Sequence, residues 1–451
     1  MKNIAVIGTG VSGLTAAYLL SKKHQVTVFE KSETIGGHTA TVDVELNNEH
    51  FAIDTGFIVF NNKTYPNYLA LLDEIGVGKQ ATEMSFSVTN SQSGLEYNGH
   101  NLDTLFAQRR NIFNPKFWHL IKQIVRFNKL CKAKYQQDEA AEALIDQRYT
   151  LGEFLAEHNF SRYFAEHYIL PMGAAIWSCS LSQMEAFQFQ FFVRFFHHHG
   201  LLNITDRPQW YVIPGGSRNY LAPLCRPFHQ RIHTNADIKG ITRNKHNDKS
   251  NNNNNNNKVQ LHFADLSTQE FDEVVIACHS DQALQLLLDA TEDEYAVLSA
   301  MPYSENSVVL HTDTNLLPKK RKAWASWNYQ LTNNREVPAS VTYNMNILQG
   351  LESEHTFCVT LNQEHAIAPE KILRKFTYHH PIFSLESIAA QQQREKICGK
   401  AHTHFAGAYW HNGFHEDGVR SAVEVAKRFD CYLDAFAPEE LRNKDNEQDV
   451  A

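Results

Sequence analysis

The sequence predicts an α/β protein in which a Rossmann-like nucleotide-binding domain with a GxGxxG motif carries an inserted, mixed α+β substrate domain. A strand, a helix and a second strand follow one another within the first thirty residues, as in a βαβ unit. Strand-like runs return near residues 230–280 and 403–410, beside blocks of different composition. We therefore expect a nucleotide-binding domain made of 1–60, 210–300 and 400–437, a substrate domain made of 61–209 and 301–399, and a flexible tail at 438–451.

The bulk composition is that of an ordinary globular chain. Of the 451 residues, 43% are hydrophobic and 20% are charged, and the net charge is −8. An acidic chain offers no electrostatic footprint for nucleic acid, so we expect no nucleic-acid partner. No run approaches the ~20 apolar residues of a membrane span, and the apolar run after Met1 is too short for a signal peptide. We therefore expect a cytoplasmic protein.

Cysteine and histidine do not stand in metal-binding patterns. No two of the seven cysteines form a CxxC pair, which fits free thiols in a reducing compartment. The run His197-His198-His199 has no Asp, Glu or Cys at ligand spacing beside it. His411 and His415 have helical spacing but lie among glycines that favour a loop. We therefore expect no metal site.

The order of the remaining elements follows from hydrophobic periodicity and from turn residues. Residues 2–7 and 25–30 are expected as strands, and residues 14–22 as the helix between them. Further helical segments are expected at 66–76, 104–137 and 150–200, and further strands at 234–243, 258–263 and 273–277. The connection between the first two of these strands contains seven consecutive asparagines, 251–257, which we interpret as a solvated loop insertion.

The first chemical motif is Gly8-Thr9-Gly10-Val11-Ser12-Gly13, which follows a predicted strand and opens a predicted helix. In such a motif Gly8 allows the tight turn, Gly10 lets the backbone approach a pyrophosphate, and Gly13 lets the helix pack on the strand. The start of the helix presents free N–H groups to phosphate. Glu30 ends the next strand about 20 residues further on, where a carboxylate binds ribose hydroxyls. The motif therefore predicts a dinucleotide cofactor.

A second glycine pair follows the ribose carboxylate in the segment Glu30-Lys31-Ser32-Glu33-Thr34-Ile35-Gly36-Gly37-His38-Thr39. A domain that binds only NAD does not need this pair, whereas a longer extended cofactor runs on past its pyrophosphate. Asp54-Thr55-Gly56-Phe57 offers another close approach of the backbone. These segments favour FAD over NAD.

The third motif lies near the end of the sequence. Phe405-Ala406-Gly407 is a predicted strand end, and a helix rich in Ala and Val begins within the segment 413–419. The free amides of a helix start stabilise the negative charge that a reduced flavin carries near N1 and the C2 carbonyl. The alternative interpretation is an ordinary C-terminal helix capped by Asp417.

These motifs resemble the flavin-containing amine oxidase superfamily, which also includes protoporphyrinogen oxidases and phytoene desaturases. The resemblance rests on the glycine motif, Glu30, the Gly36-Gly37 pair and Phe405-Ala406-Gly407. The sequence more closely resembles a bacterial subgroup of predicted NAD/FAD-binding oxidoreductases. This subgroup is similar to the N-terminal half of plant cyclopropane fatty acid synthases. That closer resemblance is carried by Gly37-His38-Thr39, Asp54-Thr55-Gly56-Phe57, Pro208-Gln209-Trp210 and Gly413-Phe414-His415-Glu416-Asp417-Gly418.

The resemblance covers nearly the whole chain and implies an order of contacts along FAD. The motif 8–13 would hold the pyrophosphate, Glu30 the AMP ribose, and the backbone of Ile238 the adenine. Thr39 and the pair 56–57 would lie along the ribityl chain and the flavin. The residues expected to contact FAD are Gly8, Gly10, Val11, Ser12, Gly13, Glu30, Lys31, Gly37, His38, Thr39, Thr55, Gly56, Phe57, Ile238, Gly407, His415, Glu416, Asp417, Gly418 and Val419.

Three positions depart from the superfamily pattern. His38 replaces the arginine of Gly-Gly-Arg, and Phe414 falls within a residue of a tyrosine of the amine-oxidase aromatic cage. The strand 306–311, expected to face the flavin, has no lysine; the nearest lysines follow Pro318, at Lys319, Lys320 and Lys322. These departures weaken the case for an amine substrate and favour a less polar one.

We therefore expect an FAD-dependent oxidoreductase that transfers a hydride from an apolar substrate, such as a fatty-acyl or isoprenoid lipid, to flavin N5. The sequence identifies no catalytic acid or base. Two alternatives stay open: an amine oxidase acting on a small amine, and a non-catalytic flavoprotein that serves a lipid-modifying partner. A disulfide-reductase type fits less well, because a second GxGxxG behind a mid-chain strand is absent.

The segment 104–137 is basic and contains no Asp or Glu. On a helix its apolar residues would share one face, with Lys122, Arg126 and Lys129 to one side. Such a helix could touch anionic lipid as an amphipathic element, in keeping with a peripheral contact at the inner membrane surface. The alternative is a helix that packs on its own domain, as most amphipathic helices do.

Overall fold

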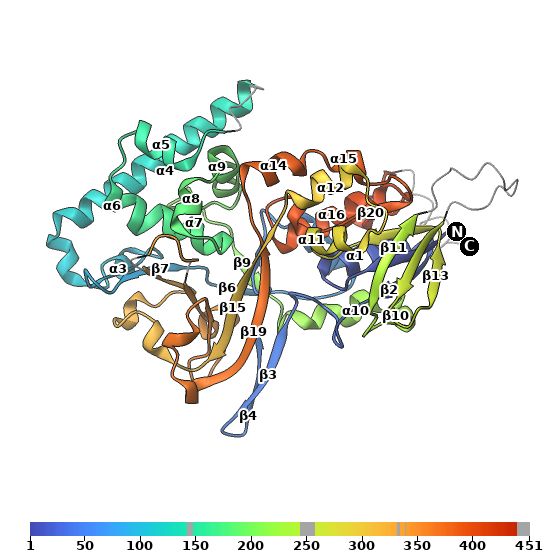
Figure 1. Ribbon diagram of the computed structural model, residues 1–451. Coiled ribbons are helices and arrows are strands. Elements are labelled where there is room, and N and C mark those ends of the chain that lie inside the picture. Colours follow the sequence, from blue (N-terminus) through green and yellow to red (C-terminus); the bar gives the residue numbers. More distant parts are fainter. Residues whose placement is uncertain (142–147, 244–257, 332–333, 339, 440–451) are drawn as a thin grey trace, which may run out of the picture.

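The computed structural model describes residues 1–141, 148–243, 258–331, 334–338 and 340–439. Figure 1 shows two blocks side by side, one around a parallel sheet and the other around a larger mixed sheet with a group of helices. The asparagine run 251–257 lies outside the described residues, as does the predicted tail from residue 440 onward.

The parallel sheet combines strands from three distant parts of the chain. Isoleucine, valine and alanine residues in its centre are fully buried because helices and loops cover both faces, which explains their near-continuous apolar sequences. Within the described residues its order is β10 (Ile232–His233), β2 (Gln25–Phe29), β1 (Asn3–Ile7), β14 (Glu273–Ile276) and β20 (Thr403–Phe405). This is the predicted Rossmann-like sheet.

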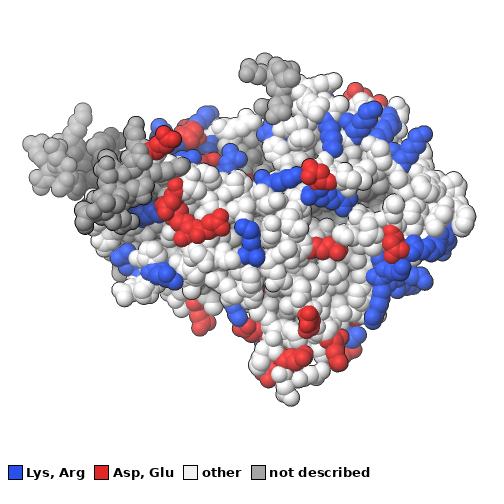
Figure 2. Space-filling view, turned by 180° about the vertical axis from the view of Figure 1, so that it is seen from behind, with Lys and Arg blue, Asp and Glu red and all other residues white. Residues whose placement is uncertain are grey.

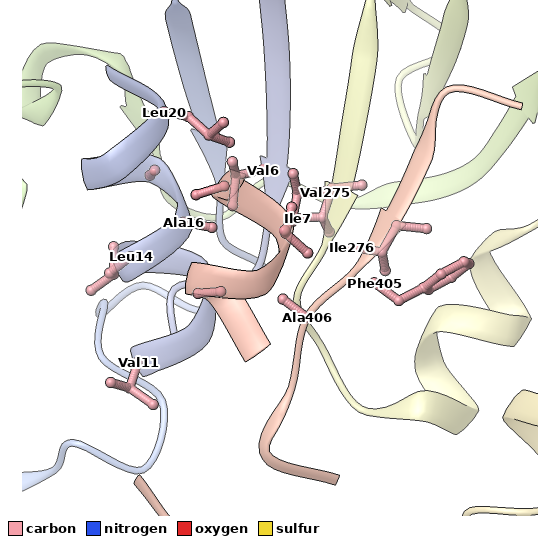
Figure 3. Packing of buried hydrophobic residues seen from close by; sticks show 14 of the residues in the cluster. Val6, Ile7, Val11, Leu14, Ala16, Leu20, Val275, Ile276, Phe405 and Ala406 are labelled. Carbon is pink, nitrogen blue, oxygen red and sulfur yellow. The ribbon is translucent and has the colours of Figure 1, made fainter. Parts of the chain in front are cut away.

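Two helices from opposite ends of the sequence pack together beside this sheet. They are α1 (Val11–Ser21) and α16 (His415–Lys427). Figure 3 shows Ala16 and Leu20 of α1 pointing toward Val6 of β1, with Ile276 and Phe405 on the strands beyond. The first and last motifs of the sequence are thereby brought to one place.

Smaller elements complete this block. An antiparallel sheet is formed by β11 (Ile238–Arg243), β12 (Val259–Phe263) and β13 (Thr268–Phe271). The helices are α2 (Pro66–Glu74), α10 (Leu221–Cys225), α11 (Ser280–Leu286), α12 (Glu292–Ser299), α14 (Leu385–Gln391) and α15 (Arg394–Ile397).

The second block contains a larger, mixed sheet. Its order is β19 (Ile372–Pro381), β15 (Tyr303–His311), β18 (Cys358–Leu361), β17 (Val341–Asn344), β16 (Trp327–Leu331), β7 (Phe86–Asn90) and β8 (Leu95–Asn98). Beside it lie α3 (Leu102–Leu105), α4 (Pro115–Ala141), α5 (Leu151–Glu157), α6 (Arg162–Phe164), α7 (Leu170–Trp177), α8 (Leu181–Glu185) and α9 (Phe189–His198).

Short strands connect the two blocks. They are β3 (Thr41–Leu46) paired with β4 (Glu49–Asp54), and β5 (Phe60–Asn61), β9 (Trp210–Val212) and β6 (Gln80–Thr82) in a small sheet, with α13 (Met345–Gln349) nearby. The hydrophobic cores include residues from both sides of the predicted domain boundaries, which stay a prediction. Tyr68 and Ile397 pack in the core of the parallel sheet, whereas Ile53 packs with Val308 in the core of the mixed sheet.

The predicted helical segment 104–137 is interrupted. A 3-10 turn at Arg109–Phe113 separates α3 from α4, and the side chain of Asn114 accepts a hydrogen bond from the Lys116 amide at the start of α4. Phe117 and Phe127 pack in the core of the helical group, so one face of α4 contacts its own domain. Among the described helices, none is both long and apolar enough to cross a membrane.

Candidate active site

A cavity of about 1140 Å³ lies between the two blocks. Its wall includes the loop between β1 and α1, the start of α16, and side chains of α4, α7 and α9. Pockets for a single drug-sized ligand measure about 300–1000 Å³. The cavity is therefore large enough to hold an extended cofactor and part of a substrate together.

The glycine motif has the geometry of a phosphate-binding turn. Gly8 has a positive φ of +100°, and a Cβ there would lie 2.8 Å from the carbonyl oxygen of Ala277. A Cβ on Gly13 would overlap the Gly8 carbonyl oxygen, so Gly13 serves the packing of α1 on β1. At Gly10 a Cβ would meet nothing within 4 Å, and Gly10 lines the cavity. This open space beside the uncapped start of α1 fits a pyrophosphate.

Glu30 is held at the edge of the same turn. Its carboxylate accepts hydrogen bonds from the backbone amide of Thr9 at 3.0 Å, from the Thr9 hydroxyl at 2.5 Å and from the Ser32 amide at 2.8 Å. Glu30, Lys31 and Ile238 all line the cavity. The carboxylate therefore has a fixed position at the end of β2, where a ribose would lie. No sequence motif indicated that Thr9 holds this carboxylate in place.

The second glycine pair packs directly on the first motif. Gly37 has a φ of +54°, and a Cβ there would lie 3.1 Å from the Gly10 Cα. A Cβ on Gly56 would overlap the carbonyl oxygen of His38, so the two segments approach more closely than side chains allow. Gly37, His38, Gly56 and Phe57 line the cavity, as predicted from their motifs.

The start of α16 brings a histidine to the cavity wall. The His415 ring stacks on Phe57 with 3.6 Å between centroids, and its Nε2 lies 2.7 Å from the Tyr220 hydroxyl. Thr39 Oγ1 lies 2.5 Å from that hydroxyl, which places Thr39 behind the wall. Burial holds the pKa of His415 well below its usual range, so the ring is neutral. No sequence motif pointed to Tyr220.

The residues that follow His415 turn away from the cavity. The Glu416 carboxylate accepts hydrogen bonds from the amides of Asn67 and Tyr68 at the start of α2, and burial raises its pKa to about 7. Asp417 accepts from the Phe414 amide and caps its own helix. A Cβ on Gly418 would lie 2.6 Å from a Val11 methyl group.

Seven predicted contact residues therefore lie outside the cavity lining: Gly13, Thr39, Thr55, Glu416, Asp417, Gly418 and Val419. Their side chains cap helices, support the wall or pack α16 against α1, and Val419 is fully buried. Whether the backbone of these seven residues contacts the cofactor stays a prediction. The other thirteen predicted contact residues line the cavity: Gly8, Gly10, Val11, Ser12, Glu30, Lys31, Gly37, His38, Gly56, Phe57, Ile238, Gly407 and His415.

Four histidines, of which only His38 was predicted, gather on the cavity wall. The His38 ring centroid lies 5.8 Å from that of His380 and 6.4 Å from that of His279, which in turn lies 6.0 Å from His379. Burial and the neighbouring histidines lower the pKa of His38 to about 3. Its Nε2 is buried without a hydrogen-bond partner, so a polar group of a bound cofactor fits there. Within the described residues, no group of three or more His, Cys, Asp or Glu side chains is arranged to hold a metal ion.

The rest of the cavity wall is largely apolar. It includes side chains from both blocks: Met84, Phe86, Tyr97, Leu105, Ile121, Ile124, Tyr168, Met172, Ile176, Trp177, Phe195, Leu201, Trp327, Tyr343, Phe383 and Phe414. The lysines that line the cavity are Lys31 and Lys239, beside Glu30 and Ile238. Strand β15 carries no lysine, as the sequence indicated.

Short stretches of curated proteins are similar to this chain. A 4,4'-diapophytoene desaturase of Staphylococcus haemolyticus is 46% identical over 54 residues, which are 12% of this chain and 10% of the desaturase. An L-amino-acid oxidase of Gloydius halys is 56% identical over 41 residues, which are 9% of this chain and 8% of the oxidase. The matched parts are thus about a tenth of each relative.

Solved structures show the same fold over nearly the whole chain. A fatty acid isomerase from P. acnes that produces CLA has a TM-score of 0.66 at 17% identity, with 95% of this chain and 98% of that chain covered. Putrescine oxidase bound to putrescine has a TM-score of 0.68 at 13% identity, with 95% and 98% covered. Residues 11–343 match the flavin containing amine oxidoreductase family. The chain therefore belongs to this family of flavin-dependent oxidoreductases.

Proposed function

We propose that the protein is an FAD-dependent oxidoreductase that acts on an apolar substrate with a long hydrocarbon chain, of the fatty-acyl or isoprenoid class. The single observation that carries the proposal is the composition of the cavity. The wall around Gly10 and Glu30 is polar and built for a nucleotide, whereas the wall formed by α4, α7 and α9 is apolar. Contact with such a wall stabilises a bound hydrocarbon chain by about 25 cal/mol for each Å² of apolar surface that is removed from water.

FAD, rather than a shorter flavin, accounts for the position of Glu30. The carboxylate is fixed by Thr9 and faces the cavity beside Ile238, which suits a ribose and an adenine. FMN has no AMP ribose and would leave this end of the cavity without a ligand. The open space at Gly10 and the unpaired Nε2 of His38 support the presence of a phosphate-linked cofactor between the two ends.

Bound FAD would supply a two-electron acceptor at N5 for a hydride from a C–H bond of the substrate. The residues of this chain bind, orient and exclude water. The amides at the start of α1 would hold the pyrophosphate, and Glu30 the ribose. The stacked pair Phe57 and His415 gives the wall a fixed surface, since Tyr220 holds the His415 ring. Phe195 of α9, together with Trp177 and Phe414, keeps water from the apolar end.

An amine oxidase on a small amine is the second candidate, because putrescine oxidase shares the fold and an L-amino-acid oxidase shares a short stretch. The cavity argues against it, since its lining lysines lie beside Glu30 and Ile238 and Phe414 stacks on Phe195 in an apolar surrounding. The names of the P. acnes isomerase and the diapophytoene desaturase refer to a fatty acid and to diapophytoene. A non-catalytic flavoprotein beside a lipid-modifying enzyme, as the cyclopropane-synthase resemblance suggests, is the third candidate.

The test is anaerobic photometry of the purified protein. We expect a yellow protein that releases FAD on denaturation and whose oxidised flavin band is lost when a detergent-dispersed fatty-acyl or isoprenoid lipid is added. Loss of the band with small amines alone would establish the second candidate. A flavin that no lipid or amine reduces would favour the third, and a colourless protein that takes up NAD would contradict the whole proposal.

A further inference from the structure

The cavity opens to solvent at three exposed apolar side chains. Leu102, Val125 and Ile204 line the cavity, yet they are 75%, 47% and 62% exposed. Residues that belong to both the cavity wall and the molecular surface mark the mouth of the cavity. The mouth therefore lies between α3, the middle of α4 and the loop that follows α9.

More exposed apolar side chains lie along α4 from Val125 toward its first turn and in the turn before it. Trp118 precedes Val125 by seven residues and lies on the same face of α4, and it is 49% exposed. Its indole N–H donates a hydrogen bond to the carbonyl oxygen of Ile112 at 2.7 Å, which ties the turn before α4 to the helix. Phe113 in that turn is 86% exposed. We call these residues the mouth surface: Leu102, Ile112, Phe113, Trp118, Val125 and Ile204.

Exposed large hydrophobic residues are concentrated there. In the described part of the chain, those outside the mouth surface are scattered singly over distant elements: Met1, Leu266, Leu288, Tyr295, Val337 and Phe436. Single exposed apolar residues need no explanation, whereas a group of them around a cavity entrance indicates an interaction site.

Basic side chains border the mouth surface. Lys116, Lys122 and Lys129 of α4 are exposed and form no ion pair within the described residues. The exposed segment 319–322, all Lys or Arg, contacts α3, where Lys322 pairs with Asp103. Figure 2 shows Lys and Arg gathered along one edge, the edge that carries α3 and α4 at the left of Figure 1.

Arg126 does not belong to this cationic border, although the sequence placed it beside Lys122 and Lys129. Its guanidinium donates a hydrogen bond to the carbonyl oxygen of His158 at 2.7 Å and lies over the ring of Phe160. It therefore secures α4 to its neighbours.

We propose that the mouth surface docks on the anionic surface of a membrane, so that a lipid chain passes from the bilayer into the cavity. Charge complementarity identifies the occupant, because unpaired lysines around exposed aromatic side chains match anionic headgroups above acyl chains. In a cytoplasmic protein this would be the inner surface of the membrane. The passage of lipid rests on the proposed function, but docking itself can be tested without turnover.

The test is sedimentation of the FAD-loaded protein with vesicles of phosphatidylcholine alone or mixed with phosphatidylglycerol. The first variant replaces Lys116, Lys122 and Lys129 by Glu. A matched variant replaces the exposed Lys396, Lys400 and Lys427 by Glu, at the other end of the molecule. Since each basic residue adds about 1 kcal/mol of attraction, the first variant should lower partition to anionic vesicles on the order of a hundredfold.

The contribution of the apolar side chains of the mouth surface to vesicle binding is tested separately. Phe113→Asp should lower partition about tenfold or more, because a large exposed aromatic side chain no longer enters the headgroup region. Its control is Leu266→Asp, since Leu266 is 92% exposed on a distant turn. Both variants should retain FAD and the melting temperature of the wild type.

Binding to anionic vesicles that is lost at high salt and in the two mouth variants supports the proposal. The proposal is overturned if the matched variants lose vesicle binding equally, or if the wild type does not bind vesicles at low salt. Binding of an acidic protein instead of vesicles would assign the surface to a protein partner. If detergent-dispersed lipid reduces the flavin while vesicles are not bound, docking is wrong and the proposed function stands. If vesicles bind but no lipid reduces the flavin, the function is wrong and docking stands.

Discussion

The two ends of the cavity are built by different means. Around Gly10 the wall is formed by backbone, and glycines allow segments to approach more closely than side chains permit. Between α4, α7 and α9 the wall is formed by side chains of residues far apart in the sequence. The first end can therefore be altered by adding a single methyl group, whereas we expect the second to be most sensitive to a change in polarity.

The largest effect is expected at Gly13. A Cβ there would overlap the Gly8 carbonyl oxygen, so Gly13→Ala must displace α1 from β1. We expect the free energy of unfolding to fall by about 3 kcal/mol or more, within the range of severe overpacking and strain. Urea unfolding followed by circular dichroism measures it.

Gly10→Ala is the matched change within the same motif. Its Cβ meets no protein atom within 4 Å, and its φ of −63° suits alanine. We expect normal stability but loss of FAD, because the methyl group occupies the space of the pyrophosphate. If Gly10→Ala retains FAD as the wild type does, the cofactor does not follow the path that the glycines indicate.

The same contrast explains why sequence motifs predicted the residues around Gly10 but not those that join the cavity wall by tertiary packing. The close approach of backbones requires glycine at fixed spacing, so Gly8, Gly10 and Gly37 could be recognised without the fold. His380 lines the cavity and Tyr220 holds His415 in its wall, both through tertiary packing, and no local pattern marks either residue. The parallel sheet was predicted correctly from its local patterns, whereas the partners of Glu416 and Asp417 could not be: their carboxylates face helix starts that only the packed structure defines.

Glu30→Ala tests the ribose position. Hydrogen bonds to charged groups contribute about 1.5–3 kcal/mol, so FAD affinity should fall roughly tenfold or more. Glu33→Ala, at an exposed position three residues later, serves as control. Titration of the apoprotein with FAD gives both dissociation constants. Equal affinities in the two variants would mean that the carboxylate at the end of β2 binds no ribose.

Acid should destabilise the cofactor-free protein. Burial lowers the pKa of His38 to about 3 and those of His199, His311 and His380 to about 4. Below pH 6.5 the unfolded chain therefore binds protons that the folded chain does not, and each histidine removes about 1.36 kcal/mol of stability per pH unit.

Two buried carboxyl groups oppose this effect. The pKa of Glu416 is raised to about 7 and that of Asp54 to about 6, so the folded chain takes up protons there as the pH falls. Because the loss at the four histidines exceeds the gain at the two carboxyl groups, the net loss of stability between pH 7.5 and pH 5.5 should be about 3 kcal/mol. Thermal unfolding at the two pH values measures it, and a higher melting temperature in acid would contradict the histidine assignment.

The apolar end is tested by Ile124→Asn. This half-buried side chain of α4 lines the cavity, and a polar amide there removes apolar surface that a hydrocarbon chain would contact. We expect the KM for a lipid substrate to rise about tenfold, since burial of an aliphatic side chain contributes about 1.5–3 kcal/mol, while FAD is retained. Loss of FAD in this variant, with the lipid KM unchanged, would show that the two ends are not separate.

The smallest effect is expected at Tyr220, a buried residue that supports His415 from behind the cavity wall. Tyr220→Phe removes the hydroxyl that lies between Thr39 Oγ1 and His415 Nε2, which are themselves 3.5 Å apart. The hydroxyl makes hydrogen bonds to both of these atoms, and each neutral hydrogen bond contributes about 1 kcal/mol, so their loss should cost roughly 1–2 kcal/mol and leave the His415 ring free to turn against Phe57. We therefore expect a small decrease in melting temperature together with a shifted flavin absorption band. Tyr295→Phe, exposed on α12, is the control for the missing hydroxyl, and an unshifted band in Tyr220→Phe would mean that the stacked pair does not contact the flavin.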